Sequence, residues 1–494
     1  MRKKNKRYMK MYALLLTMGL TLSMAACGKK NEASNTESVT TVEEATDTSP
    51  EKDESATNEE DTSGSLNNDT EKSEATEADE ASKKACSETF IKKEDIKINE
   101  TYDDSSDGGH AIEADGETTE YKNVAVTKTG EADGDEADFY GENAAVFATN
   151  GATLTLDQIT VDTDGKHANG VFSYGEGTTV NISDSYIYTK NNCSGGLMTT
   201  GGGTMVATNL TIVTDGNSSA AIRSDRGGGT VNVTGGSYTT NGKGSPAIYS
   251  TADITVSDAT LASTVSEGVV VEGKNSVTLN NVSLSADHNQ HNSDKSDYFH
   301  AVMIYQSMSG DAAVGEASFT MNGGSLTNRN GDIFFVNNTV ATISLENAEI
   351  KNEDADGLFL RAAAAGWGSE GSNGGNVTLQ AKKQTIDGDI LVDDISTLNL
   401  YLSDGSTFNG AINSDGAAGE VYVELTGGST WKLTADSYIT SLNCDADSID
   451  LNGHKLYVNG VEYTSGSASS GEKVEAKVTT LRGIMGAYHV FLVK

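Results

Sequence analysis

Proline is almost absent from this chain: its 494 residues include two prolines, where average usage would give about 25. This scarcity excludes collagen and proline-rich linker proteins. Basic side chains are also few, with 35 Lys and Arg against 72 Asp and Glu, a formal net charge of −37. The balance argues against nucleic acid as a partner, because phosphate binding needs a basic surface. Aromatic residues make up only 6% and hydrophobic residues 36%, so part of the chain is expected to form no core.

Residues 1–26 have the pattern of a bacterial export signal. Residues 1–10 hold six Lys and Arg and no acid, and a mostly apolar run follows to Ala26. That run is shorter than the roughly 20 apolar residues that span a bilayer. It ends Met24-Ala25-Ala26-Cys27-Gly28, which resembles the lipoprotein signal in which the cysteine is lipidated. We expect lipidation at Cys27 and anchoring to the bacterial cell membrane, facing the extracellular side; an ordinary secretory signal is the alternative.

Residues 27–88 form an acidic segment of Glu, Asp, Ser, Thr, Asn and Ala with almost no branched apolar side chain. This composition cannot bury enough surface to offset the entropy of ordering, so a disordered tether is expected. With Cys27 assigned to lipid, Cys86, Cys193 and Cys444 remain. Three widely separated cysteines predict neither a disulfide framework nor a zinc site.

From about residue 109 the chain repeats itself. Val146, Val171, Leu197, Ile222 and Ile248 open successive copies spaced 25, 26, 25 and 26 residues apart. Each copy has two or three short alternating runs rich in Val, Ile and Thr, broken by Gly, Asn and Asp, and no helical period. Repeats of this kind stack as coils whose strands bond to the coils on either side.

The sequence therefore predicts an all-β fold, a single-stranded right-handed parallel β-helix. We place it over residues 89–464, with a cap or tail at 465–494. The 53 glycines suit coil corners, because glycine tolerates positive φ. The scarcity of proline follows as well, since interior strands need every N–H for the ladder.

The outward side chains that open the successive repeats form a candidate binding face. Counted from the residue that opens each repeat, the first and third positions are aliphatic or small, so the second and fourth positions should point outward. Ile333 and Leu358 are taken as the first positions of two late repeats. The candidate binding residues are Phe147, Phe172, Tyr174, Arg223, Asp225, Tyr249, Glu272, Met303, Tyr305, Phe334, Phe359 and Arg361. Exposed aromatic rings stack on sugars and anchor protein partners. The alternatives are that a loop covers this face, that aromatics simply favour strands, and that Arg223 and Asp225 form a structural pair.

Two other groups are candidates for metal binding. His288, His291 and His300 lie in one insertion and could bind a transition metal, although a polar surface loop is the favoured interpretation. Asp354 and Asp356 lie in a stretch beginning at Asn352 that matches the first half of an EF-hand loop and fails at its twelfth position, Ala363. Solvated turn aspartates are favoured there, with adventitious Ca²⁺ at acidic turns as the alternative. No cofactor is required.

Several short sequence segments resemble those of a group of bacterial surface proteins, the adhesin-like β-helix proteins. These are residues 230–236 (Thr-Val-Asn-Val-Thr-Gly-Gly), Gly366-Trp367-Gly368, Ser372-Asn373-Gly374-Gly375 and Asp389-Ile390-Leu391-Val392-Asp393. Gly428-Ser429-Thr430-Trp431 looks like the C-terminal coils of pertactin-like autotransporter passengers. The wider fold is shared with pectate lyases, and a shared fold does not transfer their activity.

The resemblance implies a lipid-anchored adhesin or glycan-binding scaffold without catalysis. We expect a monomer that meets the membrane through its lipid only and has a polysaccharide or cell-surface partner. The first alternative is a polysaccharide lyase or glycoside hydrolase acting on acidic plant or host glycans. Of the motifs that polygalacturonases share, this chain has only Asp393-Asp394, and its outward carboxylates lie on different coils. The second alternative is a structural surface spacer.

Overall fold

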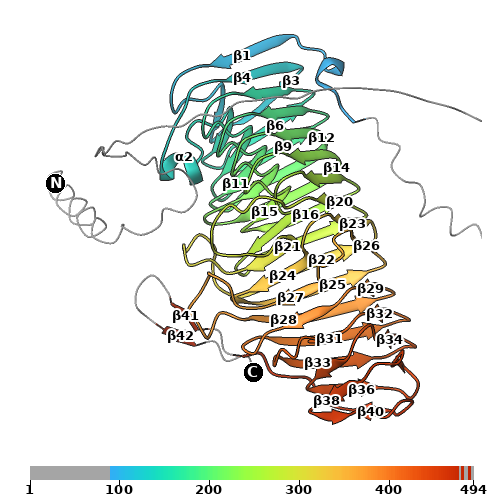
Figure 1. The fold of residues 1–494 in the computed structure, drawn as a ribbon. Coiled ribbons are helices and arrows are strands. Elements are labelled where there is room, and N and C mark those ends of the chain that lie inside the picture. The colour runs from blue at the N-terminus through green and yellow to red at the C-terminus, as the bar shows by residue number, and fades with distance from the viewer. Residues whose placement is uncertain (1–89, 478–479, 483–487, 491–494) are drawn as a thin grey trace, which may run out of the picture. The chain divides into compact units, whose positions relative to one another are not determined.

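The computed structural model describes residues 90–477, 480–482 and 488–490. The predicted signal peptide, lipidation site and tether at residues 1–88 lie outside these. The described chain is a parallel β-helix, an all-β stack of coils as predicted, running from blue to red in Figure 1. Its helices are η1 (Lys93–Asp95) and α2 (Asp135–Phe139). No helix in the described part of the chain has the length and apolarity needed to cross a bilayer.

Each coil contributes strands to three columns. The first column is an eleven-stranded sheet: β2 (Ile112–Asp115), β5 (Val146–Thr149), β8 (Val171–Tyr174), β11 (Leu197–Thr200), β13 (Ile222–Ser224), β15 (Ile248–Ser250), β18 (Val269–Glu272), β21 (His300–Tyr305), β24 (Asp332–Asn337), β27 (Leu360–Ala362) and β30 (Ile390–Val392). Val146, Val171, Leu197, Ile222 and Ile248 occupy one register in it, which confirms the repeat.

The second column lies along one side of a larger sheet. It contains β3 (Thr118–Lys122), β6 (Thr153–Asp157), β9 (Thr179–Ser183), the first parts of β12 (Gly203–Thr214) and β14 (Gly229–Thr240), β16 (Asp253–Ser257), β19 (Ser276–Asn280), β22 (Glu316–Asn322), β25 (Thr339–Glu346), β28 (Gly375–Lys382), β31 (Thr397–Ser403), β33 (Glu420–Leu425) and β36 (Ser441–Cys444).

The third column joins the second through β12 and β14, whose later parts belong to it. Its other members are β1 (Glu100–Asp104), β4 (Val124–Lys128), β7 (Thr160–Thr163), β10 (Tyr186–Thr189), β17 (Thr260–Ser263), β20 (Ser283–Ala286), β23 (Ser325–Asn328) and β26 (Glu349–Asn352). A four-stranded sheet in the later coils contains β29 (Thr385–Asp387), β32 (Thr407–Asn409), β34 (Thr430–Lys432) and β37 (Ile449–Asp450).

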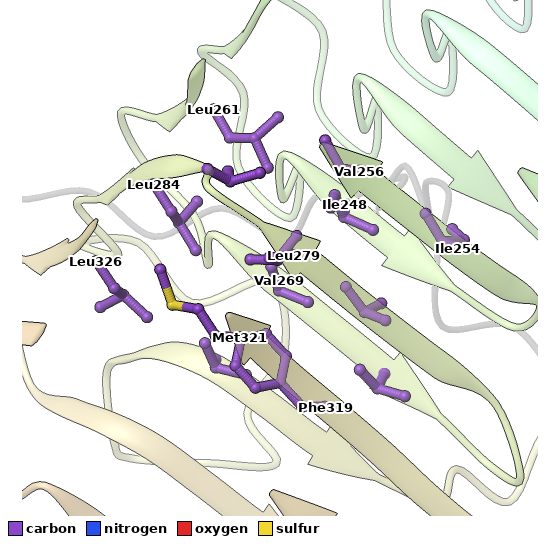
Figure 2. Close-up of a cluster of buried hydrophobic side chains, with 14 of the residues drawn as sticks. Ile248, Ile254, Val256, Leu261, Val269, Leu279, Leu284, Phe319, Met321 and Leu326 are labelled. Carbon is purple, nitrogen blue, oxygen red and sulfur yellow. The ribbon is translucent and has the colours of Figure 1, made fainter. Parts of the chain in front are cut away.

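The hydrophobic core fills the space between the columns. Ile248 and Val269 point in from the first column, Val256 and Leu279 from the second, and Leu284 from the third (Figure 2). All five are buried, and burying a side chain of this size stabilises the fold by about 1.5–3 kcal/mol. Because each coil repeats the pattern, the core is one continuous cluster from Ile112 to Leu456.

A single residue with positive φ turns the chain between the second and third columns. These positions include Asn123, Gln158, Asp184, Asn209, Asp258, Asn281 and Asn347. Lys383 and Asp404 have the same conformation where the chain passes from the second column to the four-stranded sheet. Asn and Asp tolerate this conformation better than other side-chain-bearing residues. Stacked corners also bond to each other: Asn281 Nδ2 donates to Asp258 Oδ1 at 2.7 Å, and Asn209 Nδ2 to Asp184 Oδ1 at 2.6 Å. The prediction that glycine makes the corners is therefore incomplete, since Asn and Asp make many of them.

The stack ends in short strands and a returning segment. β35 (Ser437–Ile439) pairs with β38 (Leu456–Val458), which pairs with β39 (Val461–Glu462), and β40 (Ser469–Ser470) pairs with β36 in the antiparallel direction. β41 (Thr480–Arg482) and β42 (Tyr488–Val490) form a separate hairpin. Residues 471–477, which follow β40, run back along the second column. There Val474 and Asn399 exchange two hydrogen bonds of 3.0 Å.

Candidate functional site

The predicted binding face lies on the outer side of the first column, but its register changes at β24. Val302, which points inward, pairs with Phe334, and Phe334 pairs with Leu360. Phe334 and Phe359 therefore belong to the core, which corrects their assignment to the binding face. Phe335 takes the outward position, followed by Arg361. The error arose because Ile333, Phe334, Phe335 and Val336 are all apolar, so alternation does not show which of them point outward.

The N-terminal half of this face is covered. Phe172 and Met198 are fully buried and Phe147 is 8% exposed. The segment carrying α2 lies over them: Thr200 Oγ1 donates to the Phe139 carbonyl oxygen at 2.7 Å, and the Tyr140 ring meets Tyr174 edge-on at 5.7 Å. These side chains are not free to bind a glycan, so the alternative of a covered face holds here.

The C-terminal half is also closed. Trp367, from a glycine-rich insertion, packs edge-on against Tyr305 with ring centroids 5.2 Å apart. Met303 is buried beneath this cover. Glu272 is 1% exposed and accepts hydrogen bonds from the phenols of both Tyr305, at 3.0 Å, and Tyr249. Burial raises the pKa of Glu272 and raises that of Tyr249 as well.

Three charged residues of the predicted face, Arg223, Asp225 and Arg361, form internal ion pairs. Arg223 Nη2 lies 2.7 Å from Asp225 Oδ2, and Asp225 is 3% exposed, as expected of a structural pair. Arg361 Nε lies 2.6 Å from Asp332 Oδ2, and its guanidinium lies 3.9 Å from the centroid of the Tyr298 ring. The carboxylates of Asp225 and Glu272 are thus buried. A hydrolase acting on this face would need carboxylates that its substrate can reach.

The acidic turn at Asp354 and Asp356 is internally bonded. Asp354 Oδ2 accepts the Gly331 N–H at 2.7 Å, and Asp354 Oδ1 accepts the Asp356 N–H at 3.0 Å. Neither residue belongs to a cluster of three or more potential metal ligands within the described residues. Ca²⁺ at acidic turns stays a prediction.

An open groove lies instead on the outer side of the second column, in the last coils. It has a volume of about 460 Å³ and is lined by Tyr401, Tyr422, Glu424, Asn443, Gly471, Glu472, Lys473 and Glu475. Gln380, Tyr401, Glu424 and Asn443 occupy one register on β28, β31, β33 and β36. The returning segment forms the other wall. A second hollow of about 250 Å³ shares Tyr401 and adds Gln380, Ala381, Lys382 and Ser403.

Hydrogen bonds hold the floor of this groove. The Tyr422 phenol donates to Glu424 Oε2 at 2.5 Å, and Asn443 Nδ2 donates to the same oxygen at 3.1 Å. Burial, together with Glu424, raises the pKa of Tyr422 to about 12. Tyr401 meets the Tyr422 ring edge-on at 5.8 Å and is half-buried, so part of its ring faces the groove. Sequence reasoning missed this site, although tyrosines at outward positions of β31 and β33 were a usable signal.

The histidine insertion forms a second, more compact site. His288 and His300 meet Glu267, and one ligand atom from each lies within 4.8 Å of the others. Burial lowers the pKa of His288 to about 4. Burial would raise the pKa of Glu267, but His288 and His300 outweigh it and lower that pKa below its usual range. The predicted partner His291 lies outside this group and stacks on Phe299 at 4.2 Å. Sequence reasoning missed Glu267 because it precedes the insertion by a whole coil.

A third group brings His167 and Asp138 together with Cys193. His167 Nδ1 lies 3.0 Å from Asp138 Oδ1. Cys193 is disulfide-bonded, so it offers no thiolate for a metal.

Comparison with known proteins adds no family to this picture: no family model, curated protein or solved structure matches the chain.

Proposed function

We propose that this protein is a lipid-anchored, surface-displayed β-helix that binds a neutral glycan, without turning it over, in the groove at Tyr401 and Tyr422. The groove carries the proposal, because it combines a partly open aromatic ring with polar groups already held in place. Sugar recognition uses this combination: the ring stacks on the apolar face of a sugar while fixed carboxylate and amide groups bond to hydroxyls.

The charge of the groove favours a neutral sugar over an acidic one. Glu424, Glu472 and Glu475 line it against a single cation, Lys473. The whole chain is strongly acidic as well, at −37. A uronic acid polymer would be repelled on approach and within the site. The predicted lipid at Cys27 and the acidic tether would display the groove away from the membrane, which suits adhesion to a wall or host polysaccharide.

A glycan array probed with the purified protein tests the proposal. We expect binding to neutral glycans and about tenfold weaker binding for Tyr401→Ala, because one stacking contact is lost. Tyr188→Ala is the matched control, since Tyr188 is, like Tyr401, a half-buried tyrosine on an outer face of the coils, and it lies on β10, away from the groove. No binding by the wild-type protein, or equal loss in both variants, would count against the groove. Release of reducing sugar from a bound glycan would instead indicate an enzyme.

A further inference from the structure

The spacing of Glu267, His288 and His300 is that of ligands around one ion. Glu267 Oε1 lies 3.6 Å from His300 Nε2 and 3.8 Å from His288 Nδ1. Both separations exceed the 2.7–3.2 Å typical of an N–H···O hydrogen bond. They are close to the roughly 3.3–3.6 Å between donor atoms that each lie about 2.0–2.2 Å from a tetrahedral ion.

The His300 ring is buried with the bonding capacity of both its nitrogens unused. His300 is 1% exposed, and neither of its ring nitrogens has a hydrogen-bond partner. An unsatisfied polar group at this depth is costly, and native structures rarely leave one without a ligand, water or ion. Within the described residues, the ion pairs of Glu267 are with His288 and His300 alone, so no Lys or Arg there balances its charge.

We propose that Glu267, His288 and His300 bind a divalent transition-metal ion, for which Zn²⁺ is the probe. Two imidazoles and one carboxylate suit Zn²⁺ and related ions, whereas Ca²⁺ and Mg²⁺ prefer oxygen ligands. A divalent cation would give His300 Nε2 a partner and balance the negative charge of Glu267. At His288 the ion would displace the His300 backbone N–H from Nδ1, which it now meets in a long contact of 3.3 Å.

The fold holds the three side chains from separate positions. Glu267 lies just before β18, His288 follows β20 at the start of the insertion, and His300 begins β21 where the insertion returns. Ser266 Oγ donates to the second oxygen of Glu267, and Phe335 packs on the His300 ring at 5.0 Å. A supporting bond to a ligating carboxylate and an apolar wall are common features of metal sites. A bound ion would therefore tie the insertion to the coil below it.

Isothermal titration of the chelator-treated protein, purified without a histidine tag, tests the site. We expect one Zn²⁺ per chain with a Kd below roughly 1 µM and no matching uptake of Ca²⁺. Glu267→Gln and His300→Gln should each weaken Zn²⁺ binding by more than about 100-fold, since losing a residue that only supports a ligand costs about 10–100-fold. Zn²⁺ should also raise the melting temperature of the wild-type protein and leave that of Glu267→Gln unchanged.

His454→Gln is the matched control, because His454 also faces a carboxylate, Asp436 at 4.0 Å, at an exposed site. It should bind Zn²⁺ as the wild type does. If the wild-type protein takes up no Zn²⁺, or if Glu267→Gln binds it equally well, the proposal is wrong whatever the stability of the variants. Co²⁺ gives a second readout: tetrahedral visible bands should appear in the wild-type protein and be absent from Glu267→Gln. The glycan groove is on other coils, so either proposal can fail without the other.

Discussion

The guanidinium of Arg226 lies over the ring of Phe139, with its central carbon 3.6 Å from the ring centroid. The same side chain pairs with Asp311, at 2.6 Å, and with Asp135, at 3.0 Å. Arg226 therefore joins the α2 segment to the insertion after β21, and both cover the outer side of the first column.

Replacing Arg226 with Ala should loosen this cover without unfolding the coils. We expect a loss of about 1–2 kcal/mol, since a partly buried cation–π contact and two ion pairs disappear. Hydrogen exchange should accelerate in residues 134–140, with β-strand protection unchanged. Lys190→Ala is the control, because Lys190 lies over Tyr188 at 5.5 Å on a more open surface. Unchanged exchange in the α2 segment would contradict this role.

Glu272→Gln tests whether a buried charge limits stability. Burial raises the pKa of the Glu272 carboxyl above its unfolded value, so the folded protein binds the proton more tightly. Stability from this group is then full at low pH and falls as the pH rises through the folded pKa. The neutral amide should make the protein more stable at pH 7, because its oxygen still accepts from Tyr249 and Tyr305. Thermal melting at pH 7 and at pH 4 measures this; a lower melting temperature at pH 7 would show that the charge is needed.

Lys128 depends on Asp104 near the start of the stack. The Lys128 side chain is 0% exposed, and its Nζ lies 2.8 Å from Asp104 Oδ2. Asp104→Asn should cost about 3 kcal/mol, because it leaves a buried cation without its counter-charge. Urea unfolding measures the loss. Asp157→Asn, which breaks the exposed pair with Lys122, should change little by comparison.

The same pair predicts a pH dependence of the opposite sign to that of Glu272. Burial would raise the pKa of Asp104, but hydrogen bonds from Lys128 and Ser106 outweigh it and lower that pKa. Stability from this carboxylate is full above its unfolded pKa, about 3.9, and is lost as the pH falls through the folded pKa. Asp104→Asn should therefore reduce the loss of stability in acid, as measured by urea unfolding between pH 5 and pH 2.

Two substitutions at Asn281 separate its backbone role from its side-chain role. Asn281 has φ 52° and donates to Asp258 at 2.7 Å. Asn281→Ala should lose about 1–2 kcal/mol, since alanine is strained in this conformation and cannot donate. Asn281→Gly should lose less, because glycine adopts positive φ without strain. Equal losses by chemical denaturation would mean that the side-chain ladder, and not φ, sets the corner.

The fold class, the coil length and most of the core could be predicted from the amino-acid sequence. Val146, Val171 and Leu197 could be aligned from spacing alone, because strand alternation and a fixed repeat depend on neighbours along the chain. The same reasoning identified the Arg223–Asp225 pair, two positions apart on one strand. It failed at Phe334, because four successive apolar residues show no alternation that would tell which of them point inward.

Which outward faces are open could not be predicted in this way, because it depends on contacts between segments far apart in the chain. The α2 segment contacts Tyr174 and Thr200 on later coils, and Trp367 covers Tyr305 from an insertion more than 60 residues away in sequence. The contact of Glu267 with His300 and the groove at Tyr401 likewise bring together residues from different coils or from an insertion. Local patterning determines which side of a strand a residue occupies, but loops of irregular sequence determine what lies against that side.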